Sequence, residues 1–230
     1  MAAGAMWVQE QDMLKLYTTY RSRGARNIWL AKELGIPFEV VPVIQAYRLL
    51  NRPMGVPPLN TRSPEFLRIN SRGQIPVMED NGLVLTESLA INLYLARKHG
   101  GPLSPANVAE EGQMMMWSLW AVTEVEERGL AILQNRVGRP VDERDEGAAS
   151  VAEAALRDRF PVLDAALAKT GWLVGGRFTV ADINVAEIIR YALPAADLFT
   201  DNPHVKAWLE ACHDRPAFKE MWATRDAEPA

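Results

Sequence analysis

The chain has 230 residues, of which 48% are hydrophobic and 23% charged, a balance typical of a globular protein that forms one large domain or two smaller ones. Its net charge of -4 and the lack of a dense basic cluster argue against nucleic-acid binding, and no apolar run approaches the ~20 residues that cross a bilayer. The single cysteine, Cys212, excludes an intramolecular disulfide, and no His, Cys and Asp cluster has metal-ligand spacing, so we expect no metal site.

The first twelve residues lack the basic start and the long apolar stretch of a signal peptide, and we expect residues 1–12 to form a mobile leader. The missing signal and the single cysteine together favour a cytoplasmic location. Cys212 lies in a helical pattern between Leu209 and His213, where we expect a buried apolar residue rather than a reactive thiol.

Short β-like runs alternate with helical runs in the first hundred residues. Ser22 and Ser63 are the expected N-caps of two helices, Gly35 is a stop signal, and Asp80-Asn81-Gly82 is typical of a hairpin turn. The order is β-α-β-α-β-β-α, in which the first two strands should be parallel and the last two antiparallel. Strands are predicted at 13–19, 37–44, 74–80 and 83–87, and helices at 22–35, 63–70 and 87–98.

Gly100-Gly101-Pro102 ends this alternation and is typical of a domain linker. Beyond it the chain shows helical periodicity without a convincing strand, and Pro161 is a possible kink inside one helix. The sequence therefore predicts an α/β domain at 13–100 followed by an all-helical domain at 106–230. Helices are predicted at 107–136, 146–171, 179–193 and 204–214.

The segment Ile44–Arg62 fits neither a helix nor a strand period and is rich in proline and arginine. A loop this long inside a compact domain is usually functional or mobile. Its arginines, Arg48 and Arg52 among them, can bind an anion, lie in solvent or join a subunit contact.

The dipeptide Ile75-Pro76 opens a predicted strand. Proline cannot donate to a β-ladder, so it is tolerated at an edge or after a cis peptide bond. A cis bond would turn the backbone N–H and C=O of Ile75 outward, where they can pair with an extended peptide-like ligand.

Glu87 and Ser88 open the helix that follows the last strand. A helix N-terminus presents unpaired N–H groups and a partial positive charge, so with a serine hydroxyl it can bind a ligand carboxylate without a basic side chain. Glu87 can accept a hydrogen bond from a ligand ammonium, and the pair would then hold an α-amino acid head. The alternative is an ordinary helix cap formed by Thr86 or Ser88.

Ser22 follows the first strand at the start of the first helix, where N–H groups can stabilise an anion. A hydroxyl at this position can hydrogen-bond a thiolate and lower the pKa of the thiol. A plain N-cap is the alternative, and Tyr17, Thr18, Thr19 and Tyr20 offer competing hydroxyls nearby.

The joint order of these features resembles the cytosolic glutathione transferase family, and in particular its serine-type, bacterial-like members. The resemblance covers the chain from about Leu14 to Trp222. It implies a thioredoxin-like first domain, and LVGGRFTVADINVAEII resembles the buried folding motif of the family, with Thr179 as N-cap and Asp182 at the third helical position. The other matching stretches are LYTTYRSRGARNIWLAKELGIPFE and SPEFLRINSRGQIPVMEDNGLVLTESLAINLYLARK.

The resemblance also implies how glutathione would bind. Glu87 and Ser88 would hold the γ-glutamyl head, and the backbone of Ile75, ahead of Pro76, would pair with the cysteinyl part. Gln74 occupies a position that often reaches the glycine end.

For the sulfur, the resemblance implies a hydrogen bond from the Ser22 hydroxyl. No cysteine lies near Ser22, so thiol-transfer chemistry of the cysteine type is not expected. Thr19 and Tyr20 are the other candidates for the donor.

The first helix of the second domain faces the electrophile pocket in this family. The resemblance therefore implies that Met115, Trp117 or Trp120 lines a pocket between the domains. The alternative is that this Met and Trp stripe at helical spacing belongs to the core.

The function implied is that of a cytoplasmic, homodimeric glutathione transferase that attacks a small hydrophobic electrophile in detoxification, with glutathione as substrate or cofactor and no metal. Three alternatives stay open. The protein could isomerise, dehalogenate or cleave ethers with glutathione as cofactor, act as a non-catalytic interaction module, or carry apolar ligands.

Overall fold

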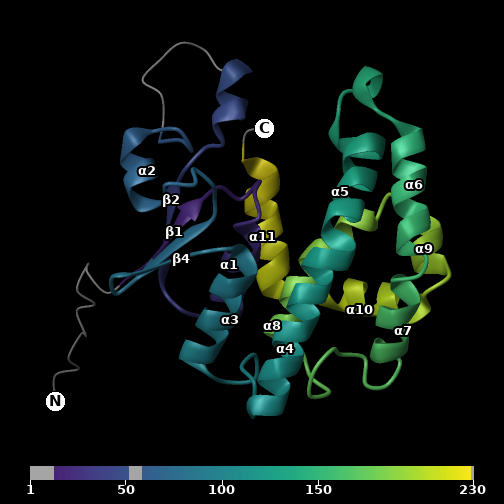
Figure 1. The fold of residues 1–230 in the computed structure, drawn as a ribbon. Coiled ribbons are helices and arrows are strands. Elements are labelled where there is room, and N and C mark those ends of the chain that lie inside the picture. Colours follow the sequence, from purple (N-terminus) through teal and green to yellow (C-terminus); the bar gives the residue numbers. More distant parts are fainter. Residues whose placement is uncertain (1–12, 52–58, 229–230) are drawn as a thin grey trace. The chain divides into compact units, whose positions relative to one another are not determined.

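The computed structural model describes residues 13–51 and 59–228 (Figure 1), so the predicted leader at 1–12 and Arg52 lie outside the described residues. The chain divides into two compact units. The first comprises the chain up to Tyr94 together with the chain from Glu220 onward, and the second comprises Leu95–Lys219.

The first unit contains a four-stranded sheet in the order β2-β1-β3-β4. β1 pairs parallel with β2 and antiparallel with β3, and β3 pairs antiparallel with β4. Figure 1 shows α1 and α3 on one side of the sheet and α2 on the other. The predicted β-α-β-α-β-β-α order and the thioredoxin-like fold are confirmed. The elements are β1 (Leu14–Thr18), α1 (Ala25–Leu34), β2 (Phe38–Pro42), α2 (Pro64–Ile69), β3 (Val77–Asp80), β4 (Leu83–Thr86) and α3 (Ser88–His99).

The turn residues behave as their types predict. Gly35 ends α1 in the left-handed conformation at φ 62°, a backbone region that glycine enters without a steric penalty. Asn81 and Gly82 also have positive φ, 50° and 82°, which matches the twist of the two strands that they join. Ser63 stands at the N-cap of α2, although its Oγ accepts the N–H of Asn60 at 3.0 Å instead of capping the helix.

The prediction that Ser22 caps α1 is wrong. The helix begins at Ala25, and Gly24 stands at the N-cap position with helical angles of φ -67° and ψ -17°. Ser22 Oγ accepts the N–H of Gly24 at 2.9 Å, so the hydroxyl stabilises the turn before the helix.

The segment Ile44–Arg62 has more regular structure than its sequence indicates. A 3-10 helix spans Ala46–Asn51, and a bridge pairs Ile44 with Asn60. The hydroxyl of Thr61 also accepts the N–H of Ala46 at 3.0 Å, so the two ends of the segment are held together.

The second unit is helical, and the only β-pairing within Leu95–Lys219 is an isolated bridge between Val174 and Arg177. The predicted helix at 146–171 is in fact two helices, because Pro161 lies in the first turn of a new helix, where its missing N–H leaves no bond unmade. No helix of the described residues is long and apolar enough to cross a membrane. Its helices are α4 (Val108–Trp120), α5 (Glu127–Leu133), α6 (Glu146–Leu156), α7 (Phe160–Leu167), α8 (Val180–Ile189), α9 (Ala196–Thr200) and α10 (Pro203–His213), with π-helical stretches at Ala121–Glu126 and Gln134–Gly138 and 3-10 turns at Val141–Glu143 and Arg190–Ala192. The last helix, α11 (Pro216–Ala227), begins in this unit and belongs to the first unit from Glu220 onward.

The fully buried helix α8 is fixed at its start by Asp182. Asp182 Oδ2 accepts the N–H of Thr179 at 2.8 Å and its hydroxyl at 3.0 Å, which forms the predicted capping box. Asp182 Oδ1 accepts the N–H of Leu173 at 3.1 Å and the indole N–H of Trp208 at 2.9 Å. Burial raises the pKa of Asp182 to about 6 although these hydrogen bonds lower it.

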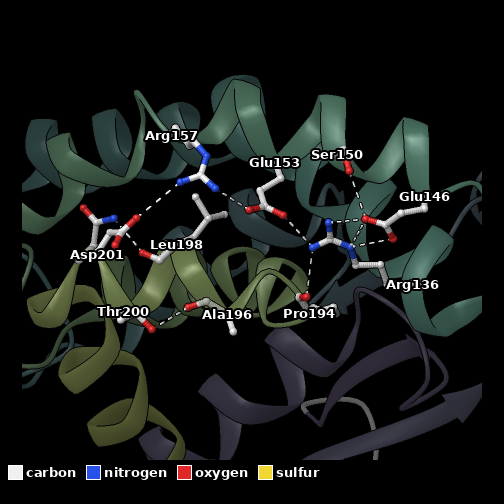
Figure 2. Close-up of polar contacts among 11 residues, drawn as sticks. Arg136, Glu146, Ser150, Glu153, Arg157, Pro194, Ala196, Leu198, Thr200 and Asp201 are labelled. Atoms are coloured by element: carbon white, nitrogen blue, oxygen red, sulfur yellow. Dashed lines mark hydrogen bonds and ion pairs between the residues drawn. The ribbon is translucent and has the colours of Figure 1, made fainter.

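A chain of ion pairs runs along α6 (Figure 2). Arg136 binds Glu146 at 2.6 Å and Glu153 at 2.8 Å, and Glu153 also binds Arg157 at 3.0 Å. The hydrogen bonds that Arg136 donates to Glu146, and to a smaller extent to Glu153, raise the pKa of Arg136. Arg136 further donates to the carbonyl of Pro194 at 3.2 Å, so this network joins α6 to its neighbours and has a structural role.

Candidate functional site

The register of the sheet brings the predicted site segments to one edge. Tyr17 of β1 pairs with Val77 of β3, and Val77 pairs with Thr86 of β4. Beyond these pairs, β1 ends at Thr18 and leads into the loop that carries Ser22, Pro76 directly precedes β3, and Glu87 directly follows β4. Three segments that are far apart in the sequence therefore meet in the first unit.

Ser22 lies half-buried in the loop after β1. Its hydroxyl donates to the carbonyl of Thr19 at 2.7 Å and lies 2.8 Å from the hydroxyl oxygen of Thr18. With the amide of Gly24 as a third neighbour, the hydroxyl is held inside the loop. A ligand sulfur can receive its proton only if the hydroxyl rotates away from the Thr19 carbonyl.

The two other candidate donors are placed differently. Thr19 is buried, and its hydroxyl has no hydrogen-bond partner among the described residues. Tyr20 is half-buried, and burial raises the pKa of its phenol, with Glu220 and Glu228 also raising it and Lys32 lowering it. Of the three hydroxyls, that of Ser22 is the one polarised by a backbone amide at the start of α1.

Glu87 and Ser88 mark the start of α3. Glu87 is an exposed residue with φ 67°, a left-handed conformation that is uncommon for a side chain of this type, and its Oε1 accepts a hydrogen bond from Arg72 at 2.7 Å. Ser88 is buried at the first position of the helix, and its Oγ accepts a hydrogen bond from Arg26 Nη1 at 3.1 Å.

The Arg26 contact was not foreseen from the sequence. Arg26 belongs to α1 and is only 1% exposed, so a guanidinium lies beneath the N-terminus of α3. The sequence contains one signal for it, because Arg26-Asn27 is a polar pair that precedes the apolar run Ile28–Ala31 of the same helix. Every residue from Ala25 to Ala31 is buried, which forces both polar side chains to find partners inside the protein.

Asn27 and Asn92 complete this buried polar layer. Asn27 Nδ2 donates to the carbonyl of Ser88 at 2.8 Å and to Asn92 Oδ1 at 2.7 Å, and Asn92 Nδ2 donates to the carbonyl of Arg26 at 3.3 Å. These bonds tie the start of α1 to the start of α3. The two helix N-termini are therefore held in fixed positions relative to each other.

The peptide bond between Ile75 and Pro76 is cis, as predicted. Ile75 packs partly buried against the cluster of Tyr17 and Phe66. Gln74 is exposed, and its carbonyl accepts a hydrogen bond from Asn70 Nδ2 at 2.8 Å. The side chain of Gln74 is thus on the surface beside the cis bond.

The described contacts give no functional role to Arg48, one of the arginines of the Ile44–Arg62 segment. Arg48 Nη1 lies 3.5 Å from Gln45 Oε1, a long local contact, and Arg52 is outside the described residues. Among the described residues, no group of three or more His, Cys, Asp or Glu side chains is arranged to hold a metal ion.

The second unit has an open apolar pocket of about 370 Å³ between α4 and α7. Trp117 and Trp120 line it with their rings edge to face at 5.3 Å. Their predicted place in a pocket between the domains stays a prediction. Met115 is exposed and does not line this pocket, whereas its neighbour Met116 does. The remaining lining residues are Val162, Ala165, Ala166 and Lys169.

Comparison with known proteins gives matches along most of the chain. The family model described as the N-terminal domain of glutathione S-transferase matches residues 22–98, and the model for the C-terminal domain matches residues 120–216. Glutathione S-transferase GstB of Escherichia coli is 30% identical over 216 residues, which cover 91% of this chain and 97% of that protein. Glutathione S-transferase 3 of Zea mays is 32% identical, covering 94% and 96%.

Solved structures agree with these matches. Glutathione transferase F7 from Populus trichocarpa superposes with a TM-score of 0.78 at 27% identity and covers 93% of this chain and 99% of its own. Glutathione S-transferase I from maize, solved with an atrazine glutathione conjugate, gives a TM-score of 0.79 at 27% identity over 94% and 100%. The chain belongs to the glutathione S-transferase family.

Proposed function

We propose that this glutathione transferase binds glutathione along the edge of the first unit and that the Ser22 hydroxyl stabilises the glutathione thiolate. The observation that carries the proposal is the sheet register, which brings the Ser22 loop, Ile75-Pro76 and Glu87-Ser88 to one edge. Glutathione has an α-amino acid head and a thiol in the middle, and this edge offers groups of matching chemistry for both.

The start of α3 suits the γ-glutamyl head. The Ser88 hydroxyl accepts from Arg26 and keeps its own proton for the ligand carboxylate, which the helix N-terminus also favours. Glu87 points its exposed carboxylate outward, where it can accept from the ligand ammonium in exchange for the Arg72 contact. Charge is thus matched to charge at both ends of the head.

The hydrogen bond from Ser22 and the helix dipole together are strong enough to lower the thiol pKa by about two units. A free thiol has a pKa of about 8.5, and lowering it by about two units requires roughly 2.7 kcal/mol of differential stabilisation. A hydrogen bond to a charged group contributes about 1.5–3 kcal/mol, and a helix dipole adds about 0.3–1 kcal/mol. The thiol proton leaves to solvent, and the thiolate sulfur forms a C–S bond with the electrophilic carbon. With an aryl halide, the carbon–halogen bond then breaks and halide leaves with its electron pair.

The second substrate is expected to be a small apolar electrophile. Two features of α4 support this preference. Apolar side chains are exposed on the helix, and Trp117 and Trp120 line the apolar pocket between α4 and α7. So does the relative from maize that was solved with an atrazine glutathione conjugate. A cytoplasmic homodimer with a role in detoxification is what family membership suggests.

The binding site is tested by the shift in melting temperature that glutathione causes. A ligand at a hundred times its Kd stabilises the folded state by about 2.7 kcal/mol, so the parent should show a clear shift. Ser88→Ala and Glu87→Gln should each reduce this shift. Glu65→Gln, which removes an exposed acid from the first turn of α2, is the matched control and should leave it unchanged.

A shift that survives in both variants would place the head group elsewhere. For the reaction, the expected product is a glutathione thioether that accumulates as the electrophile is consumed. Full recovery of free glutathione at the end of the reaction would contradict conjugation.

A further inference from the structure

The end of α11 is bound to the loop that carries Ser22. Glu228 Oε1 accepts the N–H of Tyr20 at 3.0 Å, and Glu228 Oε2 accepts the N–H of Arg21 at 2.7 Å. The two residues are consecutive, so one carboxylate binds two neighbouring backbone amides. The loop and the end of α11 belong to the same compact unit.

Further contacts run in both directions between these segments. Arg225 Nη1 donates to the carbonyl of Tyr20 at 3.0 Å. Arg21 Nε donates to the carbonyl of Arg225 at 3.1 Å, and Arg21 Nη2 donates to the carbonyl of Asp226 at 3.3 Å. The C=O of Tyr20 is therefore held by α11, and its N–H by the residue that follows α11.

The bound residues stand between the two ends of the Ser22 hydrogen bond. The Ser22 hydroxyl donates to the carbonyl of Thr19, and Tyr20 and Arg21 are the residues that separate Thr19 from Ser22. The position and direction of the Ser22 hydroxyl therefore depend on the conformation of these two residues. Glu228 fixes that conformation from outside the loop.

A second contact, separate from Glu228, also joins α11 to α1. Lys32 of α1 forms an ion pair with Glu220 of α11 at 2.5 Å, about two helical turns before Glu228. In contrast, both hydrogen bonds of the Glu228 carboxylate among the described contacts are to backbone amides of the loop, and neither is to a side chain. Its place in the fold is that of a support for the loop.

We propose that Glu228 is a positioning residue for the thiol-activating hydroxyl of Ser22. The inference rests on the proposed role of Ser22. Glu228 contacts neither glutathione nor the electrophile; it acts by holding the Tyr20–Arg21 amides, which keeps the Ser22 oxygen in one place, so that a single rotation away from the Thr19 carbonyl brings its hydroxyl to the sulfur.

The test uses the full chain and compares Glu228→Ala and Glu228→Gln with two controls. Asp226→Asn removes a negative charge from the same end of α11 without changing its carbonyl, and Glu220→Gln removes the separate ion pair. The measurements are kcat and KM for glutathione with an aryl halide, and the pH at which enzyme-bound glutathione ionises.

We expect Glu228→Ala to lower kcat about tenfold and to raise the pKa of bound glutathione by about one unit, with KM for glutathione within about twofold of the parent. Glu228→Gln, which keeps one acceptor oxygen, should lie between Glu228→Ala and the parent. Both controls should retain the parent values. Equal kcat and thiol pKa in Glu228→Ala and Asp226→Asn would overturn the inference, and so would a rise in kcat, which would mean that the carboxylate obstructs the site.

A Ser22→Ala background separates this inference from the proposed function. If Glu228 acts through Ser22, Glu228→Ala should cause no further loss of kcat once Ser22 is alanine. Losses that multiply in the double variant would overturn the positioning role alone. A Ser22→Ala variant with the turnover of the parent would instead remove the catalytic assignment, and the positioning role with it.

Discussion

A single methyl group at Gly24 should disable the site. An alanine Cβ at this position would lie 1.9 Å from Thr18 Oγ1, 2.6 Å from Thr18 Cβ and 2.8 Å from Thr18 Cγ2. Thr18 is fully buried at the end of β1 and is paired with Pro42 of β2, so it cannot move without moving the strand. Thr18 Oγ1 also contacts the Ser22 hydroxyl, so the displacement reaches the thiol-activating group.

The size of the effect follows from two opposing contributions. Gly24 has helical angles, so alanine suits its backbone and would by itself stabilise the protein by up to about 1 kcal/mol. Overpacking at a site that cannot relax costs about 1–3 kcal/mol. We therefore expect Gly24→Ala to destabilise the first unit by about 1–2 kcal/mol and to lower turnover roughly a hundredfold if Ser22 moves by about 1 Å.

Urea denaturation and steady-state turnover measure the two effects. Gly112→Ala is the matched control, because Gly112 lies in α4 with no heavy atom within 4 Å of the added Cβ, and it should gain about 0.5–1 kcal/mol. A Gly24→Ala variant with the stability and turnover of the parent would refute the close packing between Thr18, Gly24 and Ser22.

Three further predictions concern buried polar groups. Asp182→Ala should lower the free energy of unfolding by about 3 kcal/mol or more in urea titrations, because three buried donors and the part-buried N–H of Leu173 lose their acceptor. A loss below about 1 kcal/mol, on the order of one exposed hydrogen bond, would contradict this. Burial lowers the pKa of His213, which stacks on Phe218, to about 4, so its contribution to stability is present above pH 6.5 and is lost as pH falls from 6.5 toward 4. Melting temperatures in this pH range should fall less in His213→Gln than in the parent, and parallel curves would show that this group is not responsible. Arg26→Met should weaken glutathione binding roughly tenfold in calorimetry, because a charge-assisted hydrogen bond to Ser88 is lost, and unchanged affinity would remove Arg26 from the site.

Local signals in the sequence predicted much of the fold. Gly35 and Asn81-Gly82 adopt the left-handed conformations that their residue types favour, and the Thr179–Asp182 capping box forms as predicted. The alternation of strand and helix patterns gave the correct element order, since each pattern depends on residues that are close together in the sequence.

Features that depend on distant residues were not predictable in this way. The start of α1 moved to Ala25 because the Ser22 hydroxyl is used by the preceding turn. The Arg26 contact with Ser88 joins residues 62 positions apart, and the Glu228 contact with Tyr20 joins residues 208 positions apart. Periodicity along one helix contains no information about either contact.

The pH at which enzyme-bound glutathione ionises tests the central claim most directly. The absorbance of the bound thiolate, followed across a pH titration of the parent and of Ser22→Ala, gives this value for each protein. We predict a pKa about two units below that of the free thiol in the parent, and a return to within about one unit of the free value, near 8.5, in Ser22→Ala. The same ionisation midpoint in both proteins would contradict the account.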